Sequence, residues 1–159
     1  MIRYISPADD RMALSRIYEQ SWKYAYKGLI PQSYLDSIPE GRWISTPDRS
    51  GMHTLVYDSD GLIGTSSFCR SRWKNYPDCG EIVSIYFLPE HIGKGYGHEL
   101  LTAAEKELHS MGYEHILLWV LEENTRARNF YERHGYSVTG DVLDDNIGGK
   151  DIREVMYLR

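Results

Sequence analysis

The sequence of 159 residues contains little cysteine and no long apolar run. Cys69 and Cys79 are too few to form a disulfide framework or a zinc site, and they fit reduced thiols in a cytoplasmic protein. The longest apolar segment, residues 116–121, falls far short of the roughly 20 residues that a membrane-spanning helix needs. Because the first residues also lack the apolar segment of a signal peptide, we expect neither a membrane protein nor a secreted one.

An excess of positive charge and metal-ligand motifs are also missing. The chain has 18 lysines and arginines against 23 aspartates and glutamates, a formal net charge of −5. Nucleic-acid-binding proteins usually carry a basic patch or a basic excess, so we expect no nucleic acid as a partner. The six histidines are scattered and form no His-Glu-x-x-His pair, and no metal site is predicted. A mildly acidic surface would tolerate a cationic small molecule.

The hydrophobic pattern predicts one mixed α/β domain over residues 1–159, because no repeat, low-complexity tract or linker divides the chain. The passage 81–121 predicts a parallel strand pair with a right-handed helical crossover, whereas the hairpin 53–70 predicts antiparallel strands. Residues 81–88 are expected to be a central strand buried on both faces, and the polar residues 143–149 a loop. Strands are expected at 1–5, 53–57, 62–70, 81–88, 116–121, 136–138 and 152–158, and helices after Asp9 or Asp10, at 31–35, after 93–97 and after Asn124.

A glycine-rich turn lies between the strand at 81–88 and the next helix. Gly93, Gly95 and Gly97 would let the backbone approach a ligand, and free N–H groups at a helix start favour an anion such as a phosphate. The spacing fits neither the P-loop nor the dinucleotide fingerprint. Two interpretations stay open: a loop that holds the pyrophosphate of coenzyme A, or a tight turn without a ligand.

Two segments resemble the GNAT superfamily of N-acetyltransferases. Residues 87–101, Phe-Leu-Pro-Glu-His-Ile-Gly-Lys-Gly-Tyr-Gly-His-Glu-Leu-Leu, are similar to its acetyl-CoA signature, and residues 124–136 to its Asn-x-x-Ala-x-x-x-Tyr-x-x-x-Gly-Phe block. Residues 22–35 resemble the acceptor-side helices of small bacterial members. The resemblance implies a GNAT-like acyl-CoA N-acyltransferase fold, a central mixed sheet flanked by helices. One position departs from the signature: Ile92 stands where the family usually has Gln or Arg.

The resemblance also implies where acetyl-CoA would bind as co-substrate. The strand backbone before the turn would bond the pantetheine, the glycine turn would surround the pyrophosphate, and Asn124 could bond the pantetheine or serve only as a helix cap. The expected cofactor-binding residues are Ile85, Tyr86, Phe87, Leu88, Ile92, Gly93, Lys94, Gly95, Tyr96, Gly97, His98 and Asn124.

Two residues are candidates for proton transfer, since an attacking amine needs a base and a departing thiolate an acid. The resemblance makes Glu81 the general base, and a carboxylate beside an apolar strand could have a raised pKa. The alternative is a carboxylate in solvent at the strand edge. The resemblance makes Tyr131 the acid; the alternative is a packing role on the apolar stripe of its helix.

An aromatic cluster early in the chain is the candidate acceptor pocket. Trp22, Tyr26 and Tyr34, with Tyr24, could form a cage for a cation, although packing against the sheet would explain at least half of them. Asp141, Asp144 and Asp145 could attract an ammonium group or belong to a solvated loop.

These features predict an N-acetyltransferase that moves an acetyl group from acetyl-CoA to a primary amine of a small molecule or peptide by direct attack. A non-catalytic acyl-CoA-binding or sensor domain of the same fold is the alternative, and a small interaction domain without a cofactor is a third. A homodimer is compatible with the family, and no metal is required.

Overall fold

The computed structural model describes residues 1–159 and has strands and helices in the predicted order. The strands are β1 (Ile2–Tyr4), β2 (His53–Asp58), β3 (Leu62–Arg70), β4 (Gly80–Phe87), β5 (Ile116–Leu121), β6 (Ser137–Ile147) and β7 (Lys150–Leu158). The α-helices are α1 (Arg11–Ala25), α2 (Gln32–Asp36), α3 (Tyr96–Ser110) and α4 (Thr125–Arg133), and short 3-10 turns occupy Thr46–Asp48 and Pro89–His91.

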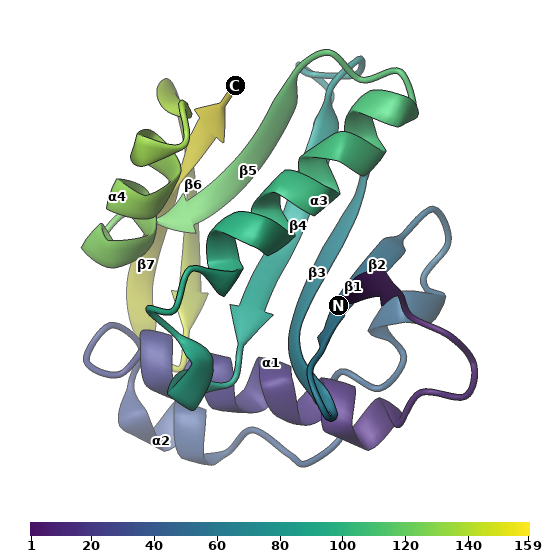
Figure 1. The fold of residues 1–159 in the computed structure, drawn as a ribbon. Helices are drawn as coiled ribbons and strands as arrows, with labels where there is room; N and C mark the ends of the chain where they lie inside the picture. Colours follow the sequence, from purple (N-terminus) through teal and green to yellow (C-terminus); the bar gives the residue numbers. More distant parts are fainter.

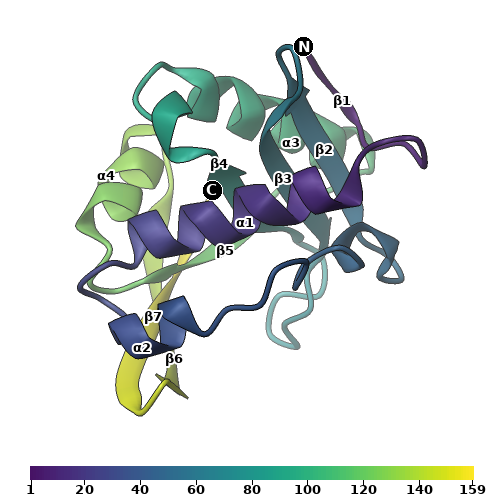
Figure 2. The ribbon, with the colours of Figure 1, turned by 90° about the horizontal axis from the view of Figure 1, so that it is seen from below.

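All seven strands form one mixed sheet in the order β1-β2-β3-β4-β5-β7-β6, in which only β4 and β5 are parallel. Helices α1 and α3 cover opposite faces. Leu55 packs in the core with the α3 residues, whereas its neighbour Val56 packs against Leu14 and Tyr18 of α1, as strand alternation requires. Figure 1 shows α3 and α4 in front of the sheet. Figure 2, a view from below, shows α1 running across the sheet. The predicted mixed α/β class is confirmed.

Helix boundaries follow the predicted capping residues. The Asp10 carboxylate accepts the backbone N–H groups of Met12 and Ala13 at 2.8 and 3.2 Å, and the Asn124 side chain accepts that of Ala127 at 3.2 Å. These bonds satisfy donors that a helix start leaves without a partner. No helix is long and apolar enough to cross a membrane.

The predicted loop at 143–149 is wrong, because most of it is strand. β6 and β7 form a hairpin in which Leu143 faces Glu154 and Ile147 faces Lys150. Its turn is the pair Gly148–Gly149, with φ of 63° and 89°, the left-handed values that a two-residue hairpin turn requires. The cross-strand pair of Asp144 and Arg153, 2.7 Å apart, supports the register. Figure 2 shows this hairpin beside α2.

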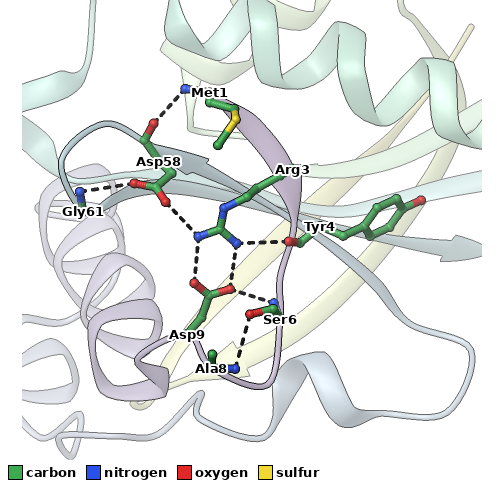
Figure 3. Close-up of polar contacts among 8 residues, drawn as sticks. All are labelled: Met1, Arg3, Tyr4, Ser6, Ala8, Asp9, Asp58 and Gly61. Atoms are coloured by element: carbon green, nitrogen blue, oxygen red, sulfur yellow. Dashed lines mark hydrogen bonds and ion pairs between the residues drawn. The ribbon is translucent and has the colours of Figure 1, made fainter.

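An ion-pair cluster fixes the N-terminal strand to the rest of the domain (Figure 3). The Arg3 guanidinium donates to both carboxylate oxygens of Asp9, at 2.8 and 2.7 Å, and to Asp58 at 2.8 Å. The Met1 amino group donates to the Asp58 carbonyl oxygen at 2.7 Å. The cluster therefore connects β1 both to the turn before α1 and to the end of β2.

Candidate active site

The two parallel strands separate soon after they meet. β4 and β5 pair only at Gly80–Ile116 and Glu81–Leu117, and Figure 1 shows them diverging from there. The register between β3 and β4 skips Val83, a bulge of the kind that bends a strand and re-aims side chains beside active sites. Residues Val83–Tyr86 are only half-buried, so the expectation of a strand buried on both faces fails for this half of β4. Backbone groups of β4 that face the gap have no strand partner.

A cavity of about 680 Å³ occupies this gap. Its walls come from β4, β5, α4, the end of α1 and the glycine turn. Nine of the predicted cofactor-binding residues lie in its wall: Ile85, Tyr86, Phe87, Ile92, Gly93, Gly95, Gly97, His98 and Asn124. The other three lie outside it. The ring of Tyr96 packs on that of Tyr57, 5.0 Å between centroids, Lys94 is exposed, and the Leu88 amide bonds the Ile63 carbonyl oxygen.

The glycine turn presents a row of free backbone donors. The N–H groups of residues 93–97 donate to no acceptor within the chain, and they precede or begin the 15-residue helix α3. Gly93 and Gly95 have φ of 81° and 88°, which L side chains rarely adopt. Free amides and a helix dipole together make an anion site. The donors fit a pyrophosphate without any side chain, so Ile92, which packs against the core, does not remove them.

Two histidines meet beside this turn. His98 Nδ1 lies 2.8 Å from His134 Nε2, and His134 Nδ1 lies 2.6 Å from the Phe130 carbonyl oxygen. The carbonyl oxygen can only accept, so His134 Nδ1 carries a proton, and a neutral His134 accepts at Nε2 from His98. This arrangement leaves Nε2 of a neutral His98 as an acceptor, free to take a hydrogen bond from a donor group in the cavity.

Tyr131 lies in the wall of the same cavity, which the glycine turn and β4 also line. Its ring packs edge-on against Phe130 and Tyr136, with centroids 5.2 and 5.8 Å apart, and its hydroxyl has no hydrogen-bond partner in the chain. Burial raises the pKa of the phenol further above its usual value, which keeps it protonated and able to donate. Both the packing role and a proton-donor role fit this position.

Glu81 lies in a different environment from the one that a general base needs. Its side chain is 1% exposed. Arg72 donates to both carboxylate oxygens, through Nη2 at 2.9 Å and Nε at 3.0 Å, and its backbone N–H adds a third bond at 3.1 Å. Trp73 Nε1 donates a fourth at 3.0 Å. The solvated edge carboxylate envisaged as the alternative is wrong. Since Arg72 and Trp73 supply all four donors, the geometry favours a role in holding residues 71–73 against β4.

A second cavity of about 420 Å³ adjoins the first. It is lined mainly by hydrophobic and aromatic side chains, including Trp22 and Tyr26 of the predicted cluster, whose rings meet edge to face at 4.9 Å. Tyr34 lies outside both cavities, and its hydroxyl accepts a bond from Arg42. Tyr24 is 50% exposed and lies under Arg126, 5.9 Å from ring centroid to guanidinium. The structure therefore brings together two of the three predicted acceptor residues.

The aspartates considered for ammonium binding have separate surroundings. Asp141 accepts bonds from Tyr76 and Thr139, and Asp144 is paired with Arg153. Only Asp145 lies in the wall of the second cavity.

Glu154 was not expected from the sequence. It lies on β7 opposite Leu121 of β5 and lines both cavities. Its carboxylate forms no hydrogen bond or ion pair, and burial, together with the charge of Asp145, raises its pKa. The signal in the sequence is a lone carboxylate within the largely apolar run 152–158.

The chain is similar to known acetyltransferases along most of its length. The model of the Acetyltransferase (GNAT) family matches residues 13–136, more than half of the chain. YuaI, an uncharacterised N-acetyltransferase of Bacillus subtilis (strain 168), is 28% identical over 155 residues, which cover 92% of this chain and 86% of that protein. The spermidine N(1)-acetyltransferase of Thermoplasma acidophilum is 25% identical over 154 residues, which cover 94% and 92%.

Solved structures agree with this assignment. The PaiA N-acetyltransferase of Thermoplasma acidophilum, solved in complex with coenzyme A, has a TM-score of 0.72 and 25% identity, with 97% of this chain and 96% of that chain covered. A ribosomal-protein-alanine N-acetyltransferase of Brucella melitensis has a TM-score of 0.77 at 18% identity, with 100% and 98% covered, and shows the same fold. The resemblance seen in the sequence is thus confirmed, and the chain belongs to the GNAT family of acetyltransferases.

Proposed function

We propose that this acetyltransferase moves an acetyl group from acetyl-CoA to a primary amine of a small molecule or peptide by direct attack. The observation that carries the proposal is the gap between β4 and β5, where one cavity is lined both by the glycine turn, with its free amides, and by Tyr131. A linear co-substrate with an anionic end and a reactive thioester end fits such a cavity. The solved complex of a relative with coenzyme A supports this choice.

Residues at one end of the cavity bind the cofactor, and Tyr131 at the other end takes part in the chemical step. The turn amides bind the pyrophosphate, and the unpaired backbone of Ile85 to Phe87 bonds the pantetheine. Asn124 combines two roles, since its side chain already caps α4 while it lines the cavity. Tyr131 donates its proton to the departing sulfur. Burial raises the pKa of this phenol and keeps it protonated, as a proton donor requires. Acetyl-CoA supplies the activated acetyl group.

The second cavity is the proposed acceptor site. Its aromatic walls, which include Trp22 and Tyr26, and the carboxylates of Asp145 and Glu154 favour an amine that enters as an ammonium ion. Relatives are named for different amines, spermidine for one and an L-amino acid for the Escherichia coli protein MnaT. We therefore propose that the acceptor is a small cationic amine, a class that includes both polyamines and amino acids.

Turnover of an amine panel tests the proposal. Wild-type protein is incubated with acetyl-CoA and spermidine, an aromatic monoamine, an amino acid or a short peptide, and released thiol and acetylated product are measured. At least one amine should be acetylated, and Tyr131→Phe should lower its kcat by about 100-fold, in the range of one lost proton-transfer group, with unchanged acetyl-CoA affinity.

Tyr113→Phe is the matched control. Tyr113 is a half-buried tyrosine outside both cavities, and its variant should keep the wild-type kcat. Binding of acetyl-CoA with no acetylation of any amine would contradict the proposal and favour a binding or sensor domain. An unchanged kcat in Tyr131→Phe would return this residue to a packing role.

A further inference from the structure

We propose that Glu154 is the catalytic base that takes the proton from the acceptor ammonium group; this assignment rests on the acetyl transfer proposed above. Among the carboxylates of the two cavities, it is the one that faces both the aromatic acceptor cavity and the cavity of Tyr131. An amine that attacks a thioester must lie where these two cavities meet.

The position of Glu154 along the sheet supports this role. Glu81 lies opposite Leu117, at the point where β4 and β5 are still paired. Glu154 lies opposite Leu121, at the far end of β5. The two positions are separated by about 13 Å at 3.3 Å per residue. Glu154 is therefore on the open side of the gap, near the start of α4 that carries Tyr131, whereas Glu81 is at its closed end.

The neighbours of Glu154 leave its carboxylate free to accept a proton. No arginine, lysine or backbone amide bonds it, in contrast to the four donors on Glu81. The charged and titratable groups that act on Glu154 or feel its charge are Asp145 of β6, Arg72, Tyr26 and Tyr86. Burial and Asp145 raise its pKa, and Arg72 opposes them. A carboxylate with a raised pKa and no bonded donor is suited to take a proton from an amine.

Glu154 and Tyr131 together account for every proton that moves in the reaction. The Glu154 carboxylate takes one proton from the ammonium group, and the neutral nitrogen then forms a bond to the thioester carbon. When the carbon–sulfur bond breaks, Tyr131 gives its proton to the sulfur. The second proton of the attacking nitrogen restores the phenol, and Glu154 loses its proton to solvent.

Matched carboxylate variants test the assignment with the best amine of the panel. Glu154→Gln should lower kcat/KM at pH 7 by about 100-fold, with acetyl-CoA affinity unchanged. The deficit should shrink above pH 9, where more of the amine is already neutral. Glu154→Asp, which keeps the carboxylate, should recover part of the activity. Glu114→Gln, at an exposed residue outside both cavities, should behave as wild type.

The melting temperature of Glu154→Gln shows whether a loss of activity comes from the missing base or from unfolding. Because an unpaired, half-buried carboxylate costs stability, Glu154→Gln should melt at a temperature no lower than the wild type. Glu154→Gln with kcat/KM within threefold of wild type, or a deficit independent of pH, would overturn the assignment and leave the acetyl transfer intact. A wild-type protein that acetylates no amine would instead overturn the proposed function, and this assignment with it.

Discussion

The surroundings of a carboxylate decide what it does in this protein. Glu81 accepts four hydrogen bonds, Glu154 accepts none, and Asp9 accepts two from one guanidinium. The pKa of Asp9 is held far below its usual range, chiefly by Arg3, whereas that of Glu154 is raised by burial. The carboxylates of Glu81 and Asp9 thus hold neighbouring segments in place, whereas that of Glu154 has no bonded donor and can accept a proton.

The Arg3 cluster predicts how stability depends on pH. Arg3 lowers the pKa of both Asp9 and Asp58, so the charged carboxylates stabilise the fold above their unfolded pKa of about 3.9. This stabilisation is lost as pH falls through the folded values. Arg3→Gln should therefore unfold at lower urea than wild type at pH 7, and the difference should narrow at pH 3.

Arg16→Gln is the control, because Arg16 is exposed on α1 and forms no ion pair. Its unfolding midpoint should match the wild type at both pH values. An Arg3→Gln difference that stays constant from pH 7 to pH 3 would contradict the electrostatic explanation.

At the scale of secondary structure, close packing limits what β3 and β4 tolerate. A Cβ atom added at Gly64 would overlap the ring of Phe87, its partner across the sheet. The Phe87 ring is held by the core, so Gly64→Ala should lower the free energy of unfolding by about 1–3 kcal/mol or more.

Gly97→Ala provides the contrasting glycine substitution. Its Cβ would meet the Phe130 ring at an ordinary 3.5 Å, and alanine is the better helix former in the first turn of α3. Urea unfolding without ligand should show Gly97→Ala at or above wild-type stability. Equal stability of the two variants would mean that the Phe87 ring moves aside freely.

Local signals predicted most of these elements, and long-range pairing explains the failures. Asp10, Asn124 and the glycine turn act within a few residues of where they stand, so the sequence places them well. The β6–β7 hairpin was missed because three consecutive polar residues of β6, Asp144, Asp145 and Asn146, are all exposed and interrupt the apolar alternation. Its Gly148–Gly149 turn was the usable signal. Glu154 depends on β7 lying between β5 and β6, a pairing that no local pattern encodes.

At the scale of the whole molecule, one break in the sheet organises the site. β4 and β5 pair at two positions and then part, and helices α1 and α4 contribute to the walls of the space between them. β4 residues of the open strand end, the glycines of the turn and Tyr131 all line this space. The proposed acceptor cavity adjoins this space, and Tyr26, Trp119, Leu121 and Glu154 are among the residues that line both cavities.

Every step proposed above requires acetyl-CoA to bind in this break of the sheet, and a calorimetric titration of the purified protein measures that binding. ATP and NAD are titrated in parallel as other ligands with phosphates. We expect micromolar binding of acetyl-CoA, about −8 kcal/mol, and much weaker binding of the two nucleotides. No heat with acetyl-CoA, or equal affinity for all three ligands, would contradict this expectation.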